Sequence, residues 1–72
     1  MEKLPLVSGK ETIRALEKIG YRVARQRGSH FRLYHNNRTA LTIPNHTELG
    51  RGLLRKILRD AELAPTEFIE LL

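Results

Sequence analysis

The segment YRVARQRGSHFRLYHNNRTALTIP, residues 21–44, contains three short runs in which core-forming side chains alternate with polar ones. Gly28-Ser29 interrupts the alternation after the first run, and Asn36-Asn37, a pair that suits a tight hairpin turn, follows the second. The third run ends at Pro44. Three such runs with brief connections predict three strands in an antiparallel meander.

Alternation assigns the side chains of this sheet to two faces. His30, Arg32 and Tyr34 are expected on one face, open to solvent. Strict alternation in the first run adds Arg22, Ala24 and Gln26 to that face, although a register change of one residue at Gly28 would exchange the faces of this strand only. The opposite face is predicted to pack against helices and to consist of Tyr21, Val23, Phe31, Leu33, Leu41 and Ile43.

Helices are predicted before and after the three strands. Ser8 and Glu11 have the spacing of a capping box, and the apolar period that follows predicts a helix over about residues 9–19. A second helix is predicted over about residues 51–62 and a short third one over about 65–72. The sequence therefore predicts an α+β fold of order α-β-β-β-α, with a three-stranded antiparallel sheet, helices on one of its faces and an appended short helix.

Length and composition narrow the class of protein. The chain has 72 residues and no cysteine, which allows one small domain and excludes a disulfide framework and a thiolate metal site. No stretch approaches the roughly 20 apolar residues of a membrane helix, and residues 1–5 lack the apolar core of a signal peptide. We expect a single domain over residues 1–72, located in the cytoplasm and without a membrane partner.

The charge of the chain is unevenly distributed. The formal net charge is +5, and residues 20–47 hold five arginines and all three histidines but no acidic residue. Two further basic stripes recur every four residues on the predicted helices, and either alone is typical of an ordinary solvated helix face. Together with the acid-free middle they favour a nucleic-acid partner. The stripes are Lys10, Arg14 and Lys18 on the first helix, and Arg51, Arg55 and Arg59 on the second.

His30 is the candidate for proton transfer. It follows Gly28-Ser29, where the backbone bends easily, and alternation places it beside Arg32 and Tyr34. An imidazole takes up and releases a proton near neutral pH, and a phosphodiester held by arginines would give that transfer a substrate. On this pattern alone, a surface histidine or a hydrogen-bonded strand histidine explains the residue at least as well. His35 and His46 are weaker candidates.

The absence of acidic residues from 20–47 argues against a metal-dependent nuclease mechanism. Metal-dependent nucleases hold their ions with clustered carboxylates, and the nearest acid, Glu48, stands alone in a predicted loop. The spacing of the three histidines does not suit a zinc site. We therefore expect no metal and no cofactor. Any phosphodiester chemistry would use RNA, whose own 2′-hydroxyl can attack once a base removes its proton.

Several motifs of the chain, in this order, resemble the HicA toxins of bacterial and archaeal toxin–antitoxin pairs. SGKE at residues 8–11 and LEKIGY at 16–21 flank the first helix, and RQRGSH at 25–30 is similar to the central motif of the family. IPNH at 43–46 follows, and ELGRGLLRKIL at 48–58 resembles the second-helix signature. Leu53 stands where the family usually has Thr, and Glu62 where it often has Gly.

The resemblance implies a double-stranded-RNA-binding-like fold, cleavage of mRNA, and inhibition by a HicB-type antitoxin protein that blocks the site. The catalytic histidine of the family follows the Gly-Ser dipeptide and therefore corresponds to His30. Arg25, Arg27 and Arg32 are then expected to hold phosphate or developing charge, and Tyr34 to stack on or hydrogen-bond a base. The complete set of expected RNA-binding residues is Arg25, Arg27, Ser29, Arg32, Tyr34, Lys10, Arg51 and Arg55.

Two alternatives remain open at this point. A non-catalytic RNA-binding module of the same fold would use His30 only as a contact. A DNA-binding or assembly protein would use the basic face to neutralise DNA or an acidic protein. A toxin should arrest growth when expressed alone, whereas a plain binding module should not.

Overall fold

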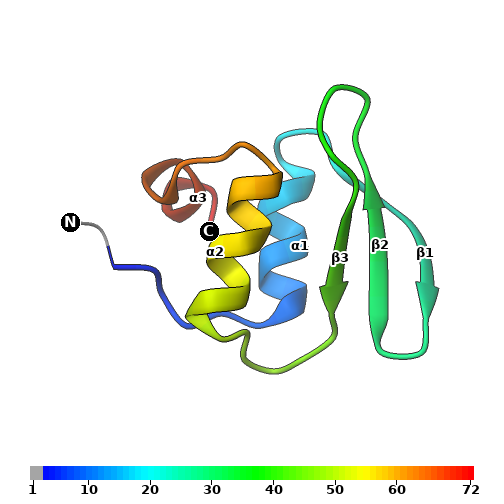
Figure 1. Cartoon of the computed structure of the whole chain (residues 1–72), viewed down its shortest axis with the longest axis horizontal. Helices are drawn as coiled ribbons and strands as arrows, with labels where there is room; N and C mark the ends of the chain where they lie inside the picture. Colours follow the sequence, from blue (N-terminus) through cyan, green and yellow to red (C-terminus); the bar gives the residue numbers. More distant parts are fainter. Residues whose placement is uncertain (1–2) are drawn as a thin grey trace.

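The computed structural model describes residues 3–72 of the chain, and its element order confirms the predicted α-β-β-β-α arrangement with an appended short helix (Figure 1). The three strands form one antiparallel sheet in the order β1-β2-β3, so the α+β fold is confirmed and is consistent with a double-stranded-RNA-binding-like topology. The elements are α1 (Gly9–Glu17), β1 (Arg22–Arg27), β2 (His30–Tyr34), β3 (Leu41–Pro44), α2 (Arg51–Asp60) and α3 (Pro65–Leu71).

The predicted capping box starts α1. The backbone N–H of Glu11 donates to Ser8 Oγ at 3.0 Å, and the backbone N–H of Ser8 donates to Glu11 Oε1 at 2.9 Å. The hydrogen bond from the Ser8 backbone N–H, supported by the Ser8 side chain, holds the pKa of the Glu11 carboxyl below its ordinary value, because it favours the charged form. Gly20, with φ of 107°, follows the helix and turns the chain toward the sheet.

The end of α2 differs from the prediction. The helix stops at Asp60 rather than Glu62, because Glu62 adopts a left-handed backbone with φ of 57°. Glycine is favoured at such a position after a helix, because it has no side chain to strain the left-handed backbone. The guanidinium of Arg38 donates to the carbonyl oxygens of Ala61 at 2.6 Å and Glu62 at 3.2 Å and so caps the helix end.

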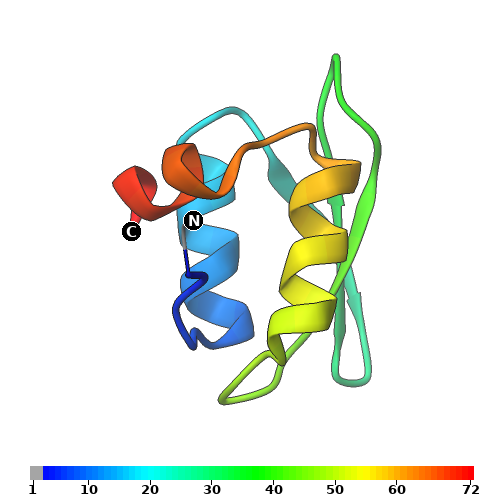
Figure 2. The ribbon, with the colours of Figure 1, turned by 60° about the vertical axis from the view of Figure 1, so that its left-hand side comes forward.

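The helices lie on one face of the sheet and enclose the core between the two layers. Figure 2 shows α1 and α2 side by side against this face, with α3 across their outer side. Leu33, Leu41 and Ile43 of the sheet are buried as predicted, and so is Tyr21. Leucines of the two long helices and Phe68 of α3 complete the core from the other side.

The sequence prediction of the core was wrong for Val23. Its side chain is 40% exposed, and Phe31 is only partly buried. The reason is that β1 is an edge strand whose residues are all exposed, whereas most residues of β3 are buried under the helices. Conversely, Leu4, Val7 and Leu49 belong to the core without having been predicted there, because an isolated bridge pairs Val7 with Leu49.

A β-bulge changes the register of β1 at Ala24, not at Gly28. Val23 pairs with Leu33 on the helix side of the sheet, but beyond the bulge Arg25 pairs with Arg32. Strict alternation would have turned Arg25 toward the helices, and the extra residue turns it outward instead. The prediction that Gln26 lies on the open face is therefore wrong, since it pairs with Phe31 on the helix side.

One end of the domain gathers the N-termini of α1 and α2, the β1–β2 turn and the loop from β3 to α2 (Figure 1). Two backbone hydrogen bonds tie these segments together, from the N–H of Asn45 to the carbonyl of Ser29 at 2.6 Å and from the N–H of Gly9 to the carbonyl of His46 at 2.9 Å. Segments far apart in the sequence are thus fixed beside His30.

Within residues 3–72, no helix combines the length and the apolar character needed to cross a membrane.

Candidate active site on the outer face of the sheet

The outer face of the sheet, which points away from the helices, carries a small cleft around His30. Cross-strand pairing sets Arg27 opposite His30 and Arg25 opposite Arg32, so the bulge at Ala24 is what brings Arg25 and Arg27 to this face. The cleft has a volume of about 160 Å³ and is called the outer cleft here. It is lined by Arg25, Arg27, His30, Phe31, Arg32 and Thr42.

The electrostatics of the outer cleft are those of an anion site. Three guanidinium groups and one imidazole line it, and no carboxylate does. The one ion pair among residues 3–72 joins Lys56 and Asp60, at 3.0 Å on α2. Arg25 and Arg32 are like charges directly opposite each other, an arrangement that destabilises a sheet by a few tenths of a kcal/mol to about 1 kcal/mol. An anion bound between the two guanidinium groups would attract both of them and so offset their mutual repulsion.

Arg32 is held more firmly than the other arginines of the cleft. Its Nη1 donates to Thr42 Oγ1 at 2.8 Å across the β2–β3 pair. Its guanidinium carbon lies 5.7 Å from the centre of the Tyr34 ring, within cation–π range. Tyr34 itself is 39% exposed, so its ring remains accessible beside the cleft.

His30 stands at the start of β2, directly after the β1–β2 turn. Gly28 in this turn has φ of 59°, a left-handed conformation that suits glycine, and nothing lies within 4 Å of the side where a side chain would project. The His30 side chain is exposed, and its ring makes no hydrogen bond to any of residues 3–72. Both ring nitrogens are therefore free to meet a substrate.

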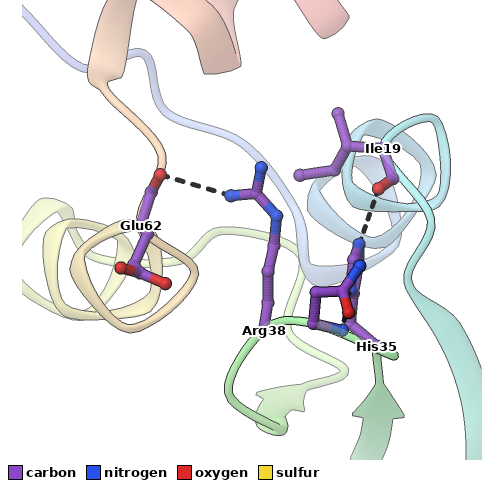
Figure 3. Close-up of a pocket in the computed structure, with 5 residues that line it drawn as sticks. Ile19, His35, Arg38 and Glu62 are labelled. Carbon is purple, nitrogen blue, oxygen red and sulfur yellow. Dashed lines mark hydrogen bonds between the residues drawn. The ribbon is translucent and has the colours of Figure 1, made fainter.

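His35 has a different, structural role. Its Nε2 donates to the carbonyl of Ile19 at 2.8 Å (Figure 3), because its Nδ1 accepts the backbone N–H of Asn37 at 2.9 Å. Its ring also meets Tyr21 edge to face, with centroids 4.8 Å apart. Burial raises the pKa of the Tyr21 hydroxyl, which donates to the carbonyl of Thr39 at 2.8 Å.

The pocket drawn in Figure 3 lies at the opposite end of the sheet from His30. It has a volume of about 400 Å³ and is lined by Ile19, His35, Asn37, Arg38 and Glu62. His35 and Arg38 are already engaged with backbone carbonyls of residues that directly follow α1 and α2, so these polar groups tie the β2–β3 hairpin to the helical layer. We therefore assign this pocket a structural role and not a catalytic one.

The expected RNA-binding residues fall into two groups. Arg25, Arg27 and Arg32 line the outer cleft together with His30, Tyr34 lies beside Arg32, and Ser29 precedes His30 in the turn. The remaining three do not line the outer cleft. Lys10 lies in the first turn of α1, Arg51 donates from Nε to the carbonyl of Leu4 at 2.8 Å, and Arg55 is exposed on α2. Arg51 thus anchors the N-terminal segment.

Two residues near the site were not predicted to contribute. Thr42 holds Arg32, and its position opposite Arg32 on the outer face follows from the alternation of β3. Asn45 holds the Ser29 turn through its backbone, for which the sequence carries no side-chain signal. No group of three or more His, Cys, Asp or Glu side chains within residues 3–72 is arranged to bind a metal ion.

One known protein family matches the part of the chain that forms the outer cleft. The family described as "HicA toxin of bacterial toxin-antitoxin" matches residues 9–63, which run from the first residue of α1 to just beyond α2 and include the outer cleft. No curated protein matches the chain. Because the family match covers well over half of the 72 residues, the chain belongs to the HicA toxin family.

Proposed function

We propose that this toxin is a metal-independent endoribonuclease that cleaves mRNA in the cytoplasm, as a single domain, with His30 as its general acid–base residue. Membership of the HicA family supports a nuclease role, an RNA substrate and an antitoxin partner. The observation that carries the proposal is the free imidazole of His30 in a cleft with three arginines and no carboxylate. We further propose that a HicB-type antitoxin blocks this cleft.

The arginines supply binding and charge stabilisation. A guanidinium presents planar N–H donors that suit a phosphate, and it keeps its charge at every relevant pH. Arg32 is preorganised by Thr42 and Tyr34, so less conformational entropy is lost when it binds. Arg25 and Arg27 approach the same space from β1. Together they would stabilise the negative charge that accumulates on the non-bridging oxygens at the transition state.

The chemistry that fits this donor set uses the 2′-hydroxyl of RNA. A ring nitrogen of His30 takes the proton of the 2′-hydroxyl, the 2′-oxygen forms a bond to phosphorus, and the bond from phosphorus to the 5′-oxygen breaks. The 5′-oxygen takes up a proton from water as it leaves. The products are a 2′,3′-cyclic phosphate and a 5′-hydroxyl. The absence of carboxylates from the cleft lining favours this route over one with divalent ions held by acidic side chains.

The test is RNA cleavage by purified protein in EDTA, comparing wild type with His30→Ala. Removal of a general acid–base group lowers kcat by about 10²- to 10⁴-fold, so we expect cleavage by the variant to fall at least about a hundredfold. Circular dichroism establishes that the variant is folded, and Lys56→Gln on α2 is a control for the preparation. Equal cleavage by wild type and His30→Ala would remove His30 from the mechanism.

The same assay distinguishes the non-catalytic alternative. A plain RNA-binding module of this fold would show salt-sensitive RNA binding but no cleavage by either protein. It would also leave growth unaffected when expressed alone, whereas the proposed ribonuclease arrests growth and His30→Ala relieves the arrest.

A further inference from the structure

A second cleft lies at the end of the sheet where β2 begins, between the start of α1 and the loop that follows β3. It has a volume of about 280 Å³ and is called the rim cleft here. Every side chain that lines it is polar or basic, and these residues are Ser8, Lys10, Asn45, His46 and Thr47.

The rim cleft and the outer cleft share a chemical character that the other concavities lack. Five concavities are described for residues 3–72, and three of them include a carboxylate in their lining, from Glu62, Glu11 or Glu17. The outer cleft and the rim cleft contain none, and each combines one imidazole with at least one fixed positive charge. Two acid-free basic clefts side by side are suited to a polyanion longer than a single phosphate.

The backbone fixes the distance between the two clefts. Pro44 pairs with His30 across β2 and β3, and His46 follows Pro44 by two residues. A cross-strand Cα separation of at most about 5.5 Å plus two extended residues puts the Cα atoms of His30 and His46 no more than about 13 Å apart. The hydrogen bond from Asn45 N–H to the Ser29 carbonyl holds the two loops in contact.

Three polar side chains of the rim cleft are available to a ligand. The His46 ring, the Lys10 ammonium and the Asn45 amide make no hydrogen bond to any other residue within 3–72, in contrast to His35, whose two ring nitrogens are both engaged. The carboxylates nearest in sequence to Lys10 and His46 do not enter the rim cleft as free groups. Glu11 accepts the Ser8 N–H in the capping box, and Glu48 is exposed and outside the cleft lining.

We propose that the rim cleft is a second phosphate subsite, in which Lys10 and His46 bind the backbone of the RNA a short distance from the phosphodiester at His30. The RNA strand then passes from the outer face over the end of the sheet to the N-terminal turn of α1. This assignment gives His46 a role in substrate binding and accounts for Lys10, which does not line the outer cleft. It rests on the proposed RNA-cleaving function.

The test is binding of a single-stranded RNA whose 2′-hydroxyls are all O-methylated, so that it cannot be cut. Affinity is measured by fluorescence anisotropy over a series of salt concentrations for wild type, Lys10→Gln and His46→Gln. A hydrogen bond to a charged group is lost in Lys10→Gln, so we expect about tenfold weaker binding and a salt slope smaller by about 0.7. His46→Gln should weaken binding about threefold.

Two matched controls separate this subsite from general charge. Lys56→Gln removes the same charge from an exposed position of α2 that lines none of the described concavities, and it should bind as wild type. Lys10→Arg keeps the charge and should keep the salt slope. With a methylated dinucleotide, which holds a single phosphodiester, the difference between wild type and Lys10→Gln should disappear.

The binding measurements distinguish failure of the rim-cleft subsite from failure of the proposed ribonuclease function. The subsite is overturned if both Lys10→Gln and His46→Gln bind the longer RNA as tightly as wild type does. It is also overturned if Lys56→Gln weakens binding as much as Lys10→Gln does. Either result would leave His30-dependent cleavage intact. A wild-type protein that binds no RNA would instead overturn the proposed function and the subsite with it.

Discussion

Gly9 is the point at which α1 touches the loop beside the site, and Gly9→Ala is therefore a quantitative test of the packing there. An added methyl group would overlap the carbonyl oxygen of Pro44 and lie 3.1 Å from its carbonyl carbon, both backbone atoms that cannot swing away. Overpacking of this kind destabilises by about 1–3 kcal/mol, and weakening the Gly9 N–H bond to His46 adds about 1 kcal/mol. The helix preference of alanine offsets up to about 1 kcal/mol.

We therefore expect Gly9→Ala to lower the free energy of unfolding by about 2 kcal/mol, which corresponds to a fall in Tm of about 10 °C for a domain of this size. The measurement is urea and thermal unfolding followed by circular dichroism.

The matched control is Gly52→Ala. Gly52 also lies in the first turn of a helix, but no atom lies within 4 Å of the space that its added methyl group would occupy. The same chemical change should therefore leave the protein as stable as wild type or stabilise it by up to about 1 kcal/mol. Equal effects of the two substitutions would refute the reasoning, because they would show that contact between α1 and the Pro44 carbonyl does not constrain this end of the domain.

Three further substitutions test other parts of the structure. His35→Ala removes two hydrogen bonds and an aromatic contact, so urea unfolding should show a loss of about 2–3 kcal/mol, and wild-type stability would contradict a structural role. Glu62→Gly relieves a left-handed backbone conformation and should raise the free energy of unfolding by up to about 1 kcal/mol, whereas a marked loss of stability would argue against that strain. The pKa of Glu11 is lowered in the folded state, so its stabilising contribution is complete above its ordinary value near 4.5 and is lost as the pH falls through the folded value. In Glu11→Gln, the free energy of unfolding should therefore depend less on pH at acid pH than it does in wild type. If the dependence is unchanged, the capping box does not cause the loss of stability at acid pH.

The succession of elements could be predicted from the sequence because each one carries a local signal. The capping box at Ser8 and Glu11 starts α1 as the spacing predicts, and the break at Gly28-Ser29 separates two strands. The outward position of His30 likewise follows from alternation within β2. These features depend on neighbours in the sequence, so reading residues in order is sufficient to find them.

Other features depend on contacts that the sequence does not encode locally. Ala24 has no property that marks it as a bulge, yet the bulge decides whether Arg25 and Arg27 face His30 or the helices. The exposure of Val23 reflects how far the helices extend over the sheet. His35 is separated from Ile19 by the whole of β1 and β2, so its structural hydrogen bond appears only in the folded chain.

The most direct test of the central claim, that the RNA's own 2′-hydroxyl is the nucleophile activated at His30, uses an RNA oligonucleotide with a single 2′-deoxy substitution at a mapped cleavage position. The account predicts that wild-type protein in EDTA no longer cuts at that position but still cuts the unmodified RNA, leaving a 2′,3′-cyclic phosphate. Undiminished cleavage at the deoxy position, with a 5′-phosphate on the product, would contradict it.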